Sequence, residues 1–414
     1  MPMGCLSRRR ILGGLGIGGL GLLGLRACLP RWLASGAPRL RSELSQRARL
    51  MIEEAYAGLD AARVWDLHVH LVGIDPKLGT WVNPNMQSHL HPLERLRYEI
   101  YMAAGGVEDS EQADEQYLQR LLALGRDANP EGKLLCMAFD YHVSEAGEEV
   151  PGLSAFYTSN ERVLGLAKAH PELAPCASVH PYRRDALERL EQVAEQGALG
   201  IKWLPNAMGI DPASPRCQAY YERLAELQLV LITHTGVEKA VHAEEHQKYG
   251  NPLRLRRALD AGVRVVAAHC ASLGSSVDLD DPARPERPAF ELFLRLMEEY
   301  SEAGNLYGEL SALTLSNRDP GVLRELLTRR ELHSRLVNGS DYPLPAINPM
   351  ISPRLLSWQE LLDSSDGAAL AEIYSANPLL FDFVLKRRLR HITGAETHRF
   401  EPALFESARL FEFA

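Results

Sequence analysis

Histidine, lysine and aspartate side chains lie at the ends of several apolar runs of this 414-residue chain. They are His68 and His70 on the first run, Lys202 on the fourth, His234 on the fifth, His269 on the sixth and Asp341 on the eighth. Imidazole and carboxylate groups are ligands that zinc and similar first-row ions take in proteins. A metal held by such groups lowers the pKa of bound water to about 7, so that hydroxide is available at neutral pH. The pattern predicts a metal centre that activates water.

Each of these residues also has a structural interpretation when it is taken alone. A histidine at the end of a strand is often a hydrogen-bonded core group, a buried lysine usually pairs with a carboxylate, and Asp341 could cap a turn. Two features favour the metal centre instead. His68 and His70 point to the same face because a strand repeats every two residues, and all the candidates fall at the same end of successive runs.

The apolar runs have the composition of strands that are buried on both faces. They are short, rich in Val, Ile, Leu and Ala, and apolar at consecutive positions. They cover residues 63–70, 133–142, 174–181, 199–205, 229–235, 263–270, 304–311 and 335–341. Helical patterns separate them, several with Asp, Asn or Pro near the start and Gly after the end. The alternation predicts an α/β fold, a (β/α)8 TIM barrel, in which the C-terminal strand ends form the active-site face.

Four segments follow from this interpretation. The barrel is expected over residues 63–390, with a partly helical insertion at 71–130 after the first strand. A short charged helix at 38–62 precedes it, and a C-terminal tail at 391–414 follows it.

The composition excludes several classes of protein. The chain is 46% hydrophobic and 24% charged, which is ordinary for a globular protein and excludes a disordered or collagen-like chain. Its formal charge is −9, and it has no basic run beyond the N-terminus, so no nucleic-acid partner is expected. Its six cysteines form no C-x-x-C pair, which argues against a zinc ribbon, a thioredoxin motif or a disulfide scaffold.

Residues 1–37 have the layout of an export signal. The basic motif SRRRIL at 7–12 precedes an apolar stretch at 13–25 that is too short to span a bilayer. The layout resembles a twin-arginine signal, which implies use of the export machinery and a periplasmic or cell-envelope location. Two alternatives are a plain N-terminal membrane anchor and attachment to the membrane through a lipid on Cys28, in a degraded LRAC lipobox.

The motifs around the candidate ligands resemble those of the amidohydrolase superfamily, in particular its amidohydrolase-related (aminocarboxymuconate-semialdehyde decarboxylase-like) branch. The matching motifs are DLHVH at 66–70, GIK at 200–202, THTG at 233–236, AH at 268–269, GSDYP at 339–343 and ANPLLF at 376–381. The resemblance runs from about residue 63 to residue 385. The motif set is specific for the superfamily and poor at identifying the substrate.

The resemblance implies a set of metal ligands. His68, His70, His234 and Asp341 hold a metal, and His269 either binds a second metal or hydrogen-bonds the substrate. The chemical state of Lys202 distinguishes two kinds of site. Relatives carry either a carboxylated lysine that bridges two metals or an unmodified lysine beside one metal. Burial favours carboxylation since it lowers the lysine pKa and supplies the neutral amine. We therefore expect a binuclear site, most simply of zinc; one metal per chain would contradict it.

The expected activity is metal-dependent hydrolysis of a small-molecule amide, ester, lactone or phosphoester. Asp341 would take a proton from the attacking water and pass it to the leaving group, while His269 would stabilise the developing charge. Two alternatives stay open: a metal-dependent decarboxylase (lyase) of an unsaturated carboxylic acid, and a non-catalytic envelope protein that keeps the barrel for binding.

Further polar residues at or just past strand ends are candidates for contacting the substrate. They are His142, His180, Trp203 and Tyr342, with Glu309 as a further candidate at the seventh run.

Overall fold

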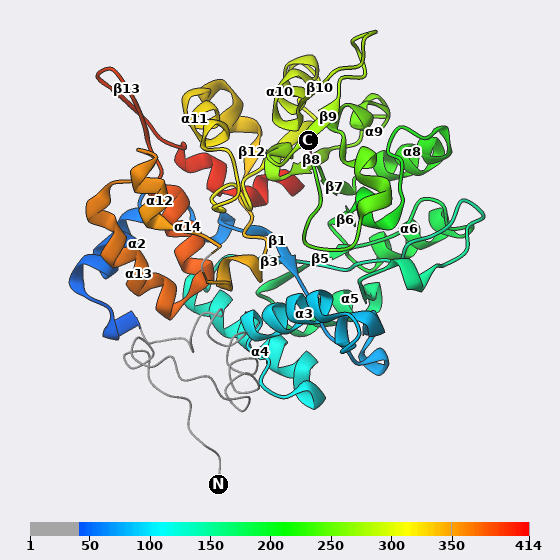
Figure 1. Cartoon of the computed structure of the whole chain (residues 1–414), viewed down its shortest axis with the longest axis horizontal. Coiled ribbons are helices and arrows are strands. Elements are labelled where there is room, and N and C mark those ends of the chain that lie inside the picture. The colour runs from blue at the N-terminus through cyan, green and yellow to red at the C-terminus, as the bar shows by residue number, and fades with distance from the viewer. Residues whose placement is uncertain (1–40, 349, 414) are drawn as a thin grey trace.

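A computed structural model describes residues 41–348 and 350–413 of the chain (Figure 1). The predicted export signal at 1–37, including Cys28, lies outside the described residues. Within them, every helix is too short or too polar to cross a bilayer.

Eight parallel strands form the centre of the molecule, as predicted. They are β1 (Asp66–His70), β3 (Leu134–Met137), β5 (Leu173–Ala177), β6 (Gly200–Trp203), β7 (Val230–His234), β8 (Val265–Ala268), β11 (Leu306–Glu309) and β12 (Leu336–Val337). They are hydrogen-bonded in chain order, from β1 through to β12. The two outer strands also meet. Leu67 N–H donates to Asn338 C=O over 3.1 Å, and Asp341 N–H donates to His68 C=O over 2.8 Å. The sheet is therefore a TIM barrel, and the predicted fold class is confirmed.

Helices surround the strands (Figure 1). They are α2 (Gln46–Tyr56), α3 (Pro92–Ala104), α4 (Ala113–Ala128), α5 (Asn160–Ala169), α6 (Ala186–Glu195), α7 (Pro205–Met208), α8 (Gln218–Glu226), α9 (Arg256–Asp260), α10 (Ala289–Glu299), α11 (Pro320–Thr328), α12 (Pro353–Trp358), α13 (Gly367–Ala376) and α14 (Pro378–Arg388). Side-chain caps fix several starts. Ser159 accepts from Arg162 N–H ahead of α5, and Asn377 accepts from two N–H groups of α14.

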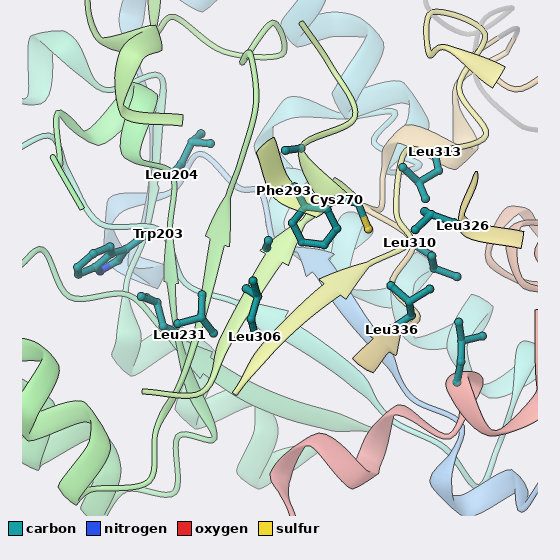
Figure 2. Packing of buried hydrophobic residues seen from close by; sticks show 14 of the residues in the cluster. Trp203, Leu204, Leu231, Cys270, Phe293, Leu306, Leu310, Leu313, Leu326 and Leu336 are labelled. Atoms are coloured by element: carbon teal, nitrogen blue, oxygen red, sulfur yellow. The ribbon is translucent and has the colours of Figure 1, made fainter. Parts of the chain in front are cut away.

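Alternate residues of each strand face the helices and the barrel interior, which explains why the strands are apolar throughout. Leu231, Leu306 and Leu336 pack outward against the helices, in the layer that also holds Phe293 of α10 (Figure 2). Their neighbours Val230 and Val337 belong to the interior cluster instead. Burial on both faces removes any polar alternation from the sequence.

The predicted C-terminal tail is folded onto the barrel. A hairpin of β13 (His391–Thr393) and β14 (Glu396–His398) comes first, and short 3-10 turns follow. Leu410 is fully buried in the interior cluster with Val230 and Val266, at the start of β7 and within β8. Arg264, just before β8, donates to the Glu412 carbonyl over 3.1 Å. The last residues thus close the N-terminal end of the barrel.

Besides the β13–β14 hairpin, two further short antiparallel pairs lie outside the barrel sheet. β2 (Thr80–Val82) in the predicted insertion pairs with β4 (Phe156–Thr158), and β9 (Ser275–Val277) pairs with β10 (Glu286–Pro288). The rest of the 71–130 insertion consists mainly of α3 and α4. The first of these pairs becomes one wall of the site described below.

Candidate metal centre

The six residues predicted as metal ligands meet at one cavity at the C-terminal end of the barrel. They are His68, His70, Lys202, His234, His269 and Asp341, and all six line a cavity of about 610 Å³ that opens to solvent. They come from β1, β6, β7 and the segments directly after β8 and β12. Residues up to 273 positions apart in the sequence are therefore neighbours because parallel strands place their carboxyl ends together.

His68, His70 and Asp341 form a compact group of donors. Asp341 Oδ1 lies 3.1 Å from His70 Nε2 and 3.6 Å from His68 Nε2. One ligand atom from each of the three lies within 4.8 Å of the other two. His269 Nε2 is 4.0 Å from Asp341 Oδ2, so its ring faces the same carboxylate.

His234 and Lys202 complete the lining from neighbouring strands. His234 Nε2 is buried and has no hydrogen-bond partner among the described residues. Lys202 is only 2% exposed, and its Nζ lies 2.9 Å from His68 Nε2. A buried nitrogen without a partner is costly, so the centre contains an acceptor that is ready for a ligand.

Left-handed backbone positions aim two of these side chains. His269, Cys270 and Ala271 have φ of 62°, 49° and 50°, and Asp341 has φ of 62°. Non-glycine residues rarely adopt these angles, and each position costs on the order of 1–3 kcal/mol. The turn at His269 ends the strand pairing directly after Ala268, which is why β8 is shorter than predicted. The pairing of β12 ends earlier than the turn at Asp341, since Asn338 N–H donates to Ser407 Oγ instead of to a strand. Such strain gathers where function requires one side-chain direction.

A second layer of polar groups holds the far nitrogens of the rings. The His68 Nδ1–H group donates to Glu309 Oε2 over 3.1 Å. Ser311 Oγ lies 2.6 Å from the same oxygen and 2.7 Å from His269 Nδ1. Glu238 Oε2 lies 3.4 Å from His234 Nδ1. These contacts turn the Nε2 atom of each ring toward the cavity, as metal-binding histidines require.

Burial and mutual charge set the protonation states. Burial lowers the pKa of His68, of His269 and of His234, the last to about 3, so the imidazoles are neutral. Burial also lowers the pKa of Lys202. For Asp341 burial acts in the opposite direction, but its neighbours His68, His70 and Lys202 prevail and lower its pKa to about 2. The site thus offers neutral imidazoles and an ionised carboxylate, which is the donor set of a zinc site.

The four residues predicted to contact substrate do not line this cavity. Lys202 faces the barrel interior, so Trp203, the next residue of the strand, faces outward and is fully buried against Tyr220 and Tyr221. Tyr342 is also fully buried, with its hydroxyl donating to the Ala104 carbonyl over 3.4 Å.

His142 lies elsewhere because its strand ends early. β3 stops at Met137, five residues before His142, rather than at residue 142 as predicted. The His142 ring stacks on His246 with 5.6 Å between centroids and lines a separate hollow of about 240 Å³.

His180 is a core histidine with both ring nitrogens in use. Its Nε2–H group donates to the Met208 carbonyl over 2.9 Å, and its Nδ1 accepts from Tyr182 N–H over 3.1 Å. The ring is fully buried, and burial lowers its pKa to about 3.

His180 should make the protein acid-sensitive. The unfolded chain protonates this ring near pH 6.5 and the folded chain only near pH 3, so stability falls as the pH drops below 6.5. We expect His180 to contribute a loss of about 2 kcal/mol between pH 7 and pH 5. Urea unfolding of the metal-free protein at both values measures this, and His180→Gln should show a smaller loss. An identical pH slope in the variant would refute the assignment.

Several residues around the site were not predicted from the sequence, or were predicted in another role. Glu238 and Ser311 lie in loops, and neither belongs to a motif that marks it. Phe139 and Phe156 form the apolar side of the cavity. Glu309, expected to contact substrate, instead lies behind His68 and does not line the cavity.

Comparison with known proteins gives a family and a set of similar folds. The family model described as amidohydrolase matches residues 65–378. No curated protein matches the chain. Similar solved structures include an uncharacterised TIM-barrel protein from Bordetella bronchiseptica, at 16% identity over 78% of this chain and 99% of that chain, with a TM-score of 0.46. A putative 2-pyrone-4,6-dicarboxylic acid hydrolase from Pseudomonas putida matches at 16% identity over 77% and 97% of the two chains, with a TM-score of 0.42. A 5-carboxyvanillate decarboxylase from Sphingomonas paucimobilis matches at 14% identity over 78% and 96%, with a TM-score of 0.37.

Proposed function

Because this chain belongs to the amidohydrolase family, we propose that it is a metal-dependent hydrolase of a small-molecule amide, ester, lactone or phosphoester. One observation carries the proposal: six metal-binding or proton-transferring side chains line a single cavity at the carboxyl ends of the barrel strands. Active sites of TIM-barrel enzymes lie at this face.

The donor set fits a divalent cation, and zinc suits its nitrogen and oxygen atoms. His68, His70, His234 and Asp341 would hold the ion, since His234 Nε2 has no other partner among the described residues and the other three already converge. When bound, the ion lowers the pKa of water and polarises the bond to be cleaved.

Lys202 would bridge to a second ion after carboxylation. The neutral amine adds carbon dioxide at Nζ and releases one proton, which gives a carbamate. Two features support this role: Nζ is buried beside His68 Nε2, and burial lowers the lysine pKa and so favours the neutral amine.

Asp341 and His269 would move the proton and stabilise charge. The oxygen of water bonds to the carbonyl carbon or phosphorus, and Asp341 accepts the proton that water loses. The bond to the leaving oxygen or nitrogen then breaks, and Asp341 returns the proton to that atom. His269 would stabilise the negative charge that develops on the oxygen of the reacting group, while Ser311 and Glu309 hold the orientation of its ring.

Metal exchange combined with a substrate screen tests the proposal. We expect the zinc-loaded protein to contain two ions per chain by elemental analysis and to hydrolyse at least one ester, lactone, amide or phosphoester. Chelation should abolish this turnover and reloading should restore it. A content of one ion per chain would refute the bridging role of Lys202 but leave the hydrolase proposal standing.

The products distinguish the alternatives. Release of carbon dioxide from an unsaturated carboxylic acid, without hydrolysis of any ester or amide, would replace the hydrolase with a decarboxylase. A zinc-loaded protein that turns over neither kind of compound would favour a binding role.

A further inference from the structure

The side of the cavity facing the metal-binding residues is apolar and partly aromatic. Phe139 and Phe156 lie with 4.3 Å between their ring centroids. Phe156 meets His70 edge to face at 6.3 Å, so this aromatic pair begins directly beside a metal-binding imidazole. Val241 and Leu344 extend the same apolar lining. A substrate whose reacting bond lies at His70 must therefore place its next atoms against hydrocarbon.

Backbone pairing makes this wall rigid. Phe139 and Thr158 exchange two hydrogen bonds, at 2.9 and 3.0 Å, and Thr158 Oγ1 donates to the Leu71 carbonyl over 2.7 Å. Phe156 lies two residues before Thr158 on β4, which is paired with β2. The two rings are therefore fixed to the strand that carries His68 and His70, and the wall is preformed.

Away from the metal centre, the part of the cavity that the structure describes has no cationic group placed to bind a negatively charged group of a substrate. Among the described residues, Lys202 is the one basic side chain that lines it, and Lys202 faces His68 as the neutral amine or carbamate of the proposed function. The other charged lining residues are Glu238 and Asp341, both acids. Arg318 acts on the pKa of His234 and His269, but it does not line the cavity and its Nε donates to the Ala312 carbonyl over 3.3 Å. A carboxylate placed against the aromatic wall would be desolvated without a partner.

We propose that the substrate is a neutral carbonyl compound with a cyclic or aromatic hydrocarbon group, such as an aryl ester or an aromatic lactone. This inference rests on the proposed function, because it places the reacting bond at the metal centre. The hydrocarbon group packs on Phe139 and Phe156, while the carbonyl faces His70 and Asp341.

Two ligands that are not hydrolysed test the preference without requiring turnover. Acetophenone is a neutral aryl ketone, and 4-acetylbenzoate is the same ketone with a carboxylate at the far side of the ring. We expect the metal-free full chain, in which no ion can bind the carboxylate, to bind acetophenone at least about ten-fold more tightly, measured by ligand-observed NMR titration. Methyl 4-acetylbenzoate is the control for size and should bind more like acetophenone.

Variants of the wall identify the cause. Phe156→Ala should weaken acetophenone binding by about two- to ten-fold, since it removes one ring of the pair. Leu344→Arg places a cation on a partly exposed position of the lining and should lower the preference for the neutral ligand by at least about five-fold. Leu93→Arg adds the same charge at an exposed position outside the cavity and should leave the preference unchanged.

The outcomes separate this inference from the proposed hydrolase. Equal or tighter binding of 4-acetylbenzoate by the unmodified protein would overturn the inference, even if esters are hydrolysed. Failure of both ketones to bind would overturn it as well. A preserved preference for acetophenone, with no hydrolysis of any neutral ester or lactone, would support the binding preference and reject the hydrolase.

Discussion

Replacing Asp341 with asparagine is expected to lower kcat by about 10²- to 10⁴-fold, the usual contribution of a positioned acid–base group. The carboxylate lies 3.1 Å from His70 Nε2, and the neighbouring charges keep its pKa at about 2, so it is ionised at neutral pH. Asparagine has nearly the same shape but neither accepts nor returns a proton. The measurement is kcat of the zinc-loaded variant on whichever substrate the screen identifies.

Metal content decides how this result is interpreted. Elemental analysis must show that the asparagine variant still holds zinc, because an amide oxygen is a weaker ligand than a carboxylate. Glu238→Gln is the matched control, since Glu238 is a second buried acid on the same cavity but lies 3.4 Å from His234 Nδ1 rather than facing His70. Its loss should be much smaller. An Asp341→Asn protein with full zinc content and full turnover would remove Asp341 from the proton transfer.

The fold was predictable because strands that are buried on both faces appear in the sequence as continuous apolar runs. Each barrel strand lies within one of the eight predicted apolar runs or starts one residue before it, as β5 does at Leu173. The meeting of the six cavity residues followed from the same rule, since strand ends in a closed parallel barrel share one face. Both inferences needed only the local apolar patterns and the closed, parallel arrangement of the strands.

The residues around the substrate pocket were not predictable in the same way. Trp203 is the exception, because it follows Lys202 directly and the two-residue repeat of a strand already places it on the opposite face. His142 depended on where β3 ends, and that end is set by the pairing of Phe139 with Thr158, a contact between distant residues. Glu238 and Ser311 are placed by loops whose course no periodic pattern describes. Local signals identify the face that carries the candidate ligands, whereas the pocket depends on tertiary contacts.

Glu309→Gln is expected to weaken zinc binding by about 10- to 100-fold although Glu309 does not line the cavity. The buried carboxylate accepts from the His68 ring at one oxygen and from Ser311 N–H at the other. A glutamine has one acceptor oxygen, so its NH₂ group must face one of these donors. His68 then loses either its charged partner or its fixed orientation, and its Nε2 becomes a poorer ligand. Competition with a chromophoric chelator measures the affinity without any substrate.

Ser311→Ala provides the matched comparison for this effect. It removes the hydroxyl between Glu309 and His269 but keeps the carboxylate that faces His68. If the charge behind His68 sets the affinity, Ser311→Ala should lose less than about ten-fold while Glu309→Gln loses more. Equal losses would show that the network acts through packing alone. Wild-type affinity in Glu309→Gln, with unchanged unfolding in urea, would show that His68 keeps its orientation without this carboxylate, so the positioning of the centre would have to come from the strained turns at His269 and Asp341.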